Sequence, residues 1–148
     1  MQTIRRHLNN NDLVAAVHAS RRLLEHILRN VCIANQTKMK YKENHYALIE
    51  YFNAAYGEIN FHTKESSLAD YYEDIFFEIE QTRYLGNEFV HGDGDEDLTS
   101  DDAKTFCDAV ENLQKAVTYD ECGGYLKFNK WTNRAQCTNH KCYSRFDI

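Results

Sequence analysis

The chain has 148 residues, of which 43% are hydrophobic, so it is long and apolar enough to bury a real core, which excludes a disordered chain. Proline is absent, which favours long uninterrupted helices. The first residues lack the apolar stretch of a signal peptide, and no run approaches the roughly 20 apolar residues of a membrane helix. We therefore expect a cytoplasmic protein with no membrane partner.

The net charge of −6 is unevenly distributed along the chain. Residues 1–40 hold seven basic and two acidic residues (+5), residues 41–121 hold five and twenty (−15), and residues 122–148 hold five and one (+4). The basic ends favour local contact with nucleic acid, whereas the acidic middle is repelled by it. The alternative is a solvated acidic surface without such a role.

Hydrophobic periodicity predicts four amphipathic helices, which together form a bundle. The first spans about residues 11–35 and is capped by Asn10 or Asn11. Its buried stripe consists of Leu13, Val17, Ser20, Leu24, Ile27, Leu28 and Val31. Its opposite, polar face carries His18, Arg22, Glu25 and Arg29.

The second predicted helix spans about residues 44–57 and ends near Gly57, followed by a connection. The third begins at Ser66 or Ser67 and runs to about His91, where Gly92 ends it. Its predicted stripe is Leu68, Tyr71, Tyr72, Ile75, Ile79, Thr82, Gly86 and Val90. The fourth helix spans about residues 99–118.

Residues 119–148 change character, with paired glycines, alternating apolar residues and a turn-like Thr-Asn-Arg. This pattern predicts a small β-ribbon beginning near Cys122. The expected fold is therefore mainly α: a four-helix bundle over residues 1–118 and a C-terminal β-ribbon over residues 119–148.

A polar line runs along the end of the third predicted helix. Arg83, Asn87 and His91 recur at steps of four, so they form a continuous ridge. A histidine can exchange a proton near neutral pH, an arginine can hold a phosphate, and an amide can orient the histidine or a ribose hydroxyl. The alternative is structural: a histidine that caps carbonyls and an arginine paired with Glu80 or Glu88.

A second apolar face is expected on the outer side of the same helix. It carries Phe76, Phe77 and Tyr84. A helix with apolar residues on two faces is stabilised when another surface covers the second face, so we expect this face to line a groove or a homodimer interface.

Two stretches, ASRRLLEHIL and TRYLGNEFVH, together resemble the HEPN superfamily, over about residues 8–118. The similarity is to a branch whose signature reads Arg, Gly-Asn, then His. It implies a homodimeric, metal-independent endoribonuclease of a defence, toxin or counter-defence system, which needs no cofactor for catalysis. In that reading His91 is the acid or base, Arg83 clamps the phosphate and Asn87 orients the histidine or a ribose hydroxyl, although the arginine's usual place is Gly86.

The same resemblance assigns a role to two residues of the first predicted helix. Arg22 and Glu25 match the second polar pair of the branch, and it implies that they brace the groove or the interface.

The C-terminal cysteines have a spacing that suits a metal. Cys122, Cys137 and Cys142 stand as C-x14-C-x4-C, with His140 inside the second interval, and zinc prefers four such ligands. The segment resembles the degenerate form of the small zinc ribbon of bacterial type I topoisomerases, with Tyr119 in place of one cysteine. That resemblance implies structural zinc and binding of single-stranded DNA; the alternative is a metal-free ribbon with buried thiols.

Basic and aromatic residues alternate in this segment. Lys127, Lys130, Trp131 and Arg134 suit phosphate contact and base stacking, although the aromatics of the segment suit a ribbon core equally well. The sequence thus favours a HEPN-like protein acting on RNA. The alternative is a non-catalytic protein-interaction or nucleic-acid-mimic module, and a nucleotide-binding domain is a third reading.

Overall fold

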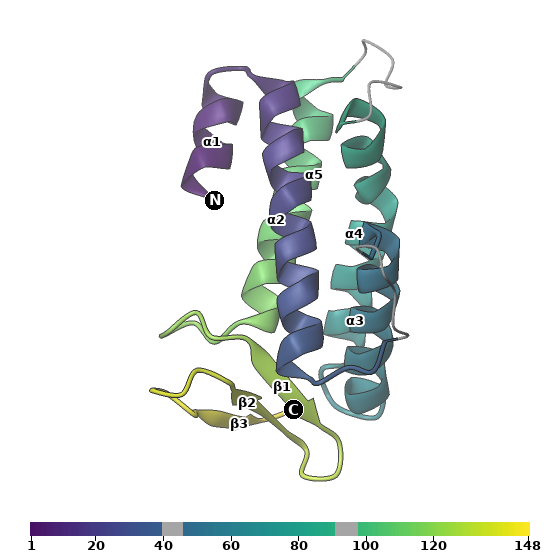
Figure 1. The fold of residues 1–148 in the computed structure, drawn as a ribbon, viewed down its shortest axis with the longest axis vertical. Helices are drawn as coiled ribbons and strands as arrows, with labels where there is room; N and C mark the ends of the chain where they lie inside the picture. Colours follow the sequence, from purple (N-terminus) through teal and green to yellow (C-terminus); the bar gives the residue numbers. More distant parts are fainter. Residues whose placement is uncertain (40–45, 91–97) are drawn as a thin grey trace. The chain divides into compact units, whose positions relative to one another are not determined.

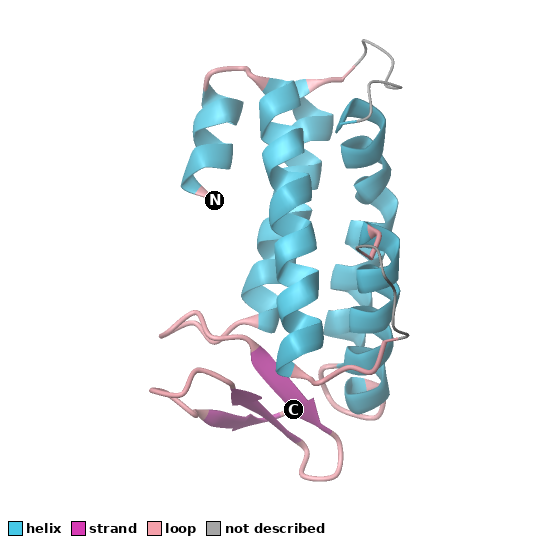
Figure 2. Cartoon of the chain, in the orientation of Figure 1, coloured by secondary structure: helices cyan, strands magenta, loops and turns pink. Residues whose placement is uncertain are grey.

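The computed structural model of the protein describes residues 1–39, 46–90 and 98–148, without the side chains of residues 83–90. Within these ranges it contains five helices and three strands (Figures 1 and 2). They are α1 (Gln2–Asn9), α2 (Leu13–Ala34), α3 (Leu48–Thr63), α4 (Ala69–Val90), α5 (Ser100–Val117), β1 (Leu126–Asn129), β2 (Arg134–Cys137) and β3 (Arg145–Asp147). The mainly helical fold with a small C-terminal sheet is confirmed.

The predicted count of four helices is wrong, because the short helix α1 precedes the others. Asn10 and Asn11 do not cap the next helix but end α1: Asn10 is its C-cap, and Asn11 has a φ of 55°. The amide of Asp12 then donates to the carbonyl of His7 over 2.8 Å. Asparagine tolerates this left-handed conformation well, so the asparagine run is the turn between α1 and α2.

Helix α3 continues past Gly57, where the sequence predicted its end. Its buried residues Phe52, Ala55, Ile59 and His62 follow each other at steps of three or four, as on one face of a helix. A side chain at Gly57 would meet nothing within 4 Å, so this glycine marks no turn. It costs about 1 kcal/mol relative to alanine, which the buried face on either side outweighs.

The buried face of α2 agrees with the prediction, since its stripe is buried with only Leu13 at intermediate exposure. The stripe of α4 differs. Among its described side chains, those of Tyr72, Ile75, Phe76 and Ile79 are buried, at positions i, i+3, i+4 and i+7. Phe76, predicted for an outer face, is therefore a core residue.

Two residues of α4 are exposed large aromatics. Tyr71, which was predicted for the core, is 47% exposed, and Phe77 is 62% exposed. Of the three residues predicted for an outer face, Phe77 is exposed and Phe76 is not, and the side chain of Tyr84 lies outside the description.

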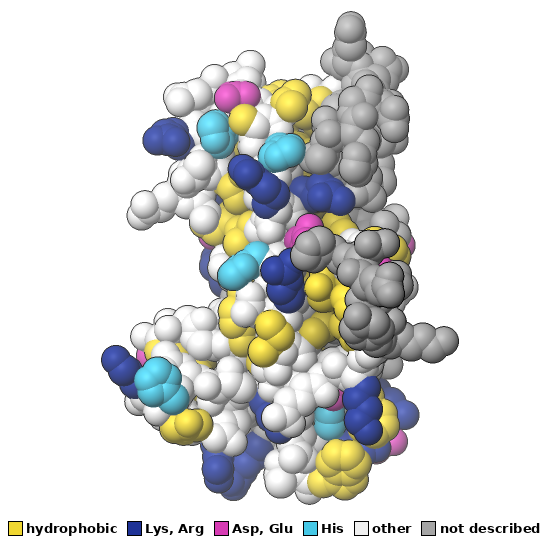
Figure 3. All heavy atoms as spheres, viewed as in Figure 1, with side chains coloured by type: hydrophobic (Ala, Val, Ile, Leu, Met, Phe, Trp, Pro, Cys, Tyr) yellow, Lys and Arg dark blue, Asp and Glu magenta, His cyan; other side chains and the backbone are white. Residues whose placement is uncertain are grey.

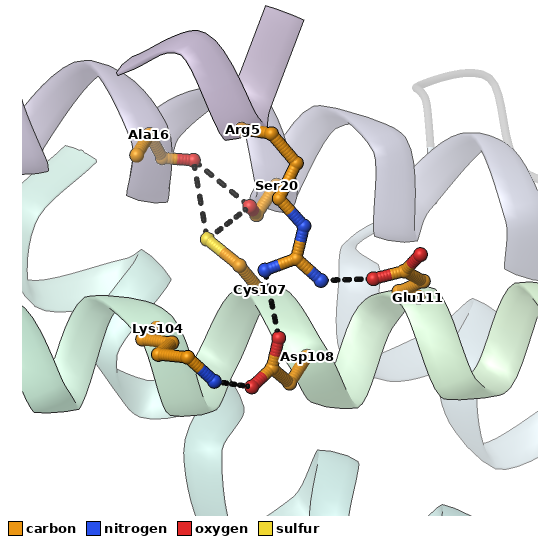
Figure 4. A network of polar contacts seen from close by, with 7 residues as sticks. All are labelled: Arg5, Ala16, Ser20, Lys104, Cys107, Asp108 and Glu111. Carbon is orange, nitrogen blue, oxygen red and sulfur yellow. Dashed lines mark hydrogen bonds and ion pairs between the residues drawn. The ribbon is translucent and has the colours of Figure 1, made fainter. Parts of the chain in front are cut away.

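The chain forms two compact units, Met1–Leu24 with Ile75–Gln114 and Glu25–Asp74 with Lys115–Ile148. In the first unit α1 is fastened to α5 (Figure 4). Arg5 forms ion pairs with Asp108, over 2.8 Å, and with Glu111. Ile4 of α1 is buried together with Ala16 and Cys107.

In the second unit Asn35 ties the end of α2 to β1. Its side-chain amide donates to the carbonyl of Leu126 over 3.0 Å, and its oxygen accepts from the amide of Phe128 over 2.9 Å. Asn35 is only 6% exposed. It therefore serves a strand backbone with both of its polar atoms where water has little access.

None of the described helices combines the length and the apolar character needed to cross a membrane. The sequence-based domain boundary between residues 118 and 119 stays a prediction.

Candidate nucleic-acid interface and cysteine cluster

The C-terminal sheet has one buried and one polar face. Its strands are antiparallel in the order β1-β2-β3, so successive side chains alternate between the faces. The buried residues are Leu126, Phe128, Ala135 and Cys137. The ring of Phe128 meets the edge of Tyr72, with 5.2 Å between centroids, and the Tyr72 hydroxyl donates to the carbonyl of Ala116 over 3.0 Å.

The other face of the sheet carries only polar residues. The register places Lys127 opposite Gln136 and Gln136 opposite Arg145, which makes one row across all three strands. A second row consists of Asn129, Arg134 and Asp147. We call these two rows the outer face.

A surface depression of about 300 Å³ follows the outer face. It is lined by Lys127, Asn129, Thr132, Arg134, Gln136 and Arg145. In the space-filling view, Lys and Arg side chains are exposed at the lower end of the molecule, in the region of the sheet (Figure 3). The depression thus offers positive charge together with amide and hydroxyl groups.

The outer face keeps most of its positive charge available. Arg134 Nε lies 3.5 Å from Asp147 Oδ1, and both side chains are well exposed, so the pair is weak. Among the described residues, no carboxylate forms an ion pair with Lys127 or Arg145.

The loop between β1 and β2 presents an aromatic ring. The side-chain oxygen of Asn129 accepts hydrogen bonds from the amides of Trp131, over 3.0 Å, and Thr132, over 3.2 Å. These bonds fix the turn that carries Trp131, which is 73% exposed. The alternative that every aromatic of the segment is core holds for Phe128 and fails for Trp131.

Two residues of α3 support this loop. The centroid of Trp131 lies 6.0 Å from that of Phe61 and 5.8 Å from that of His62. The Lys130 ammonium lies 4.0 Å from the Phe61 ring centroid and 5.3 Å from that of Trp131, within the range of a cation–π interaction. A second depression of about 290 Å³ is lined by these side chains and by Lys64.

The His62 imidazole is held by its two nitrogens. Nδ1 accepts the amide hydrogen of Lys130 over 3.1 Å, and Nε2 lies 3.3 Å from a carboxylate oxygen of Glu58. Because an amide can only donate, Nδ1 must carry a lone pair, which places the ring proton on Nε2 facing Glu58.

Sequence reasoning missed Phe61 and His62, because it assigned them to a connection after Gly57. The signal was present: Ile59, His62 and Thr63 continue the spacing of the buried face of α3. By contrast, the four residues predicted to contact nucleic acid, Lys127, Lys130, Trp131 and Arg134, do lie together on β1, β2 and their loop.

The predicted nuclease residues lie outside the description. His91 is not among the described residues, and nothing is described for the side chains of Arg83, Tyr84 and Asn87. Their roles stay predictions.

The polar pair expected from the first predicted helix is described on α2. Arg22 is exposed. Glu25 lies 3.5 Å from Arg29 in an ion pair one turn apart, so its carboxylate is engaged within its own helix.

Three of the predicted metal ligands come together. The sulfurs of Cys122, Cys137 and Cys142 all lie within 4.8 Å of one another, and those of Cys122 and Cys137 are 3.3 Å apart. Thiolates at this separation can hold a metal ion. His140, predicted as the fourth ligand, is exposed in the turn between Cys137 and Cys142 and does not belong to the group.

Comparison with known proteins gives no relative: no protein-family model, no curated protein and no solved structure matches the chain.

Proposed function

We propose that the protein binds single-stranded RNA through the outer face of its C-terminal sheet and the adjoining Trp131 loop. The observation that carries the proposal is the row of Lys127, Gln136 and Arg145 across the three strands, at the floor of a basic depression. A backbone of phosphates suits the two charges, and binding of this kind weakens steeply with salt.

The aromatic loop supports a single strand over a duplex. Unpaired bases can stack on an exposed ring such as Trp131, whereas the bases of a duplex are already stacked. The ammonium of Lys130, beside that ring, is placed to meet the phosphate of a stacked nucleotide.

The neutral polar groups favour RNA over DNA. Asn129, Thr132 and Gln136 line the same depression and can both donate and accept hydrogen bonds. The 2′-hydroxyl of ribose offers a donor and an acceptor to such groups, and DNA lacks it.

The proposal includes a HEPN-like role for the helices. In this role the ribbon presents RNA to a catalytic ridge of Arg83, Asn87 and His91 in a homodimer, as the resemblance implies. The exposed Phe77, beside a depression of about 450 Å³ on α4 and α5, supports a contact surface there.

A protein partner is the second candidate, and the same depression favours it. Its lining includes Phe77 and the carboxylate of Glu78, whereas the carboxylate of Asp108, which also lines it, is paired with Arg5 and Lys104. An apolar ring beside a carboxylate suits a basic partner protein. Recovery of such a partner by the wild type, and equally by a variant that is mutated in the sheet but keeps Phe77, would favour this reading.

Fluorescence anisotropy with a labelled oligonucleotide tests RNA binding. The full chain should bind single-stranded RNA more tightly than DNA of the same sequence or duplex RNA. Charge reversal of Lys127 and Arg145 to Glu should lower the affinity by about tenfold or more and flatten its salt dependence, because each lost phosphate contact removes about 0.7 from the logarithmic slope.

A matched control reverses two exposed basic residues that are not part of the sheet, Arg6 and Lys38, to Glu. It changes the net charge equally and should leave the salt slope nearly unchanged. Trp131→Ala should weaken binding by about 1–3 kcal/mol without changing the slope. Equal binding by the Lys127/Arg145 variant and the wild type would contradict the proposal.

A further inference from the structure

The sulfurs of three cysteines come together at one end of the sheet. Cys122 lies before β1, Cys137 ends β2 and Cys142 lies before β3. Three cysteines from separate places in the sequence thus have their sulfurs within 4.8 Å of one another. All three are free thiols.

Backbone amides are aimed at two of the sulfurs. The amide of Gly124 lies 3.4 Å from the sulfur of Cys122, and the amide of Asn139 lies 3.4 Å from the sulfur of Cys137. In both cases the donor is two residues after the cysteine. Such N–H donors stabilise a sulfur that carries negative charge, which is the form that binds a metal.

The third sulfur has a comparable surrounding. The hydroxyl of Ser144, again two residues after the cysteine, lies 3.1 Å from the sulfur of Cys142. The residues that follow Cys122 and Cys142 both adopt the left-handed conformation, with a φ of 69° at Gly123 and 51° at Tyr143. A non-glycine residue seldom takes this conformation, so the same local turn is built twice around a cysteine.

The packing around the sulfurs requires a glycine. A Cβ atom at Gly124 would lie 2.5 Å from the sulfur of Cys137 and 2.8 Å from the Cβ of Asn139. The backbone at Gly124 therefore passes directly against the second sulfur while its amide serves the first.

The separations suit a zinc ion. A Zn–S bond of about 2.3 Å in tetrahedral geometry places two sulfurs about 3.8 Å apart. The sulfurs of Cys122 and Cys137 are 3.3 Å apart, and no two of the three sulfurs are more than 4.8 Å apart. These two distances lie on either side of the value expected for zinc.

The protein supplies three ligands to this group. In the described part of the chain, no histidine, aspartate, glutamate or further cysteine joins it, and His140 is exposed. Zinc sites closed by the protein have four protein ligands, whereas sites with three protein ligands keep one position for water or another small donor.

We propose that Cys122, Cys137 and Cys142 bind one zinc ion as three thiolates and leave its fourth position open to an external donor. Binding releases the protons of the thiols, because the metal takes the place of hydrogen on each sulfur. The site is independent of the RNA-binding face, which lies on the opposite side of the strands from Cys137.

Titration of the reduced, metal-free full chain with Co²⁺ and then Zn²⁺ tests the proposal. One Co²⁺ per chain should produce the charge-transfer absorption of thiolate ligands, and zinc should displace it. Addition of imidazole or 2-mercaptoethanol should change the cobalt spectrum, because an open position accepts the added donor. If the wild type does not bind Co²⁺ saturably, the site is overturned. If neither imidazole nor 2-mercaptoethanol changes the cobalt spectrum, the open position is overturned.

Variants assign the ligands. Cys122→Ser, Cys137→Ser and Cys142→Ser should each lower the affinity for Co²⁺ at least tenfold, whereas His140→Ala and Cys32→Ala should leave it unchanged. Circular dichroism of each variant checks its fold. A triple serine variant that keeps the charge-transfer absorption, or a His140→Ala variant that loses it, would overturn the assignment.

Discussion

The amide of Lys130 donates a hydrogen bond to Nδ1 of His62 over 3.1 Å, and this bond joins the loop between β1 and β2 to the last turn of α3. His62 is only 9% exposed, so water is a poor substitute for either partner. The histidine thus acts here as a fixed acceptor that holds the loop carrying Trp131.

His62→Ala should lower the free energy of unfolding by about 1–3 kcal/mol, because it leaves the amide of Lys130 without its acceptor. It should also weaken binding of single-stranded RNA, since the Trp131 loop loses its anchor. Urea unfolding and anisotropy measure the two effects. The exposed His18→Ala on α2 serves as the control and should change stability by less than about 0.5 kcal/mol. Equal stability of the two variants would rule out the anchoring role.

Asn35→Ala should destabilise the protein more, by about 2–4 kcal/mol. It removes the partner of two strand groups, the carbonyl of Leu126 and the amide of Phe128, in a buried place. Asn30→Ala, one turn and a half earlier on α2, removes only exposed contacts with His26 and is the matched control. Urea unfolding that gave both variants the same midpoint would contradict the role of Asn35.

The buried thiol of Cys32 should resist alkylation. Burial, followed by the charge of Glu58, raises its pKa from 9.0 to about 11, so at pH 8 it is overwhelmingly the unreactive protonated form. Since the folded pKa is raised, the protonated thiol stabilises the fold below pH 9, and this contribution is lost as the pH rises through about 11.

Maleimide labelling of the metal-free protein, followed by mass spectrometry, measures this difference. The exposed Cys122 should be modified well before the buried Cys32, whereas labelling in urea should remove the difference. Equal rates for the two cysteines in the folded protein would contradict the prediction.

Cleavage of RNA tests the HEPN-like reading. The purified protein should cut single-stranded RNA in the presence of EDTA and leave a 2′,3′-cyclic phosphate, because the 2′-hydroxyl acts as the nucleophile. His91→Ala should abolish cutting while retaining RNA binding, and His26→Ala should not affect it. A wild-type protein that leaves structured and unstructured RNAs intact would refute the ribonuclease but not the RNA-binding proposal.

Periodicity predicted much of the fold because burial leaves a regular trace in the sequence. The stripe of α2 and the presence of a small C-terminal sheet follow from it directly, although the first strand begins at Leu126 and not near Cys122. Helix α1 was hidden because its asparagines suit a helix start as well as a helix end. The end of α3 was misplaced because Gly57 was taken as a stop, although the buried spacing continues to Thr63.

The site was predicted in part for a similar reason. The sequence singled out Lys127 and Arg134 for phosphate contact, but only the strand register shows that they share a face with Arg145. Phe76 lies one turn after Tyr72 and one turn before Ile79, at the border of the predicted stripe of α4. The rotation of the helix decides whether such a border residue is buried, and a single sequence does not fix that rotation. Phe61 approaches Trp131 from another element, which spacing alone does not reveal.

Gly124 has a consequence for tracing the descent of this chain. Because a methyl group there would collide with the sulfur of Cys137, every other amino acid at this place displaces the pair of sulfurs. Distant relatives that keep the three cysteines should also keep a glycine at this position, even where the sequences of the helices have diverged. A search for them is therefore better guided by this glycine and the cysteines than by overall similarity.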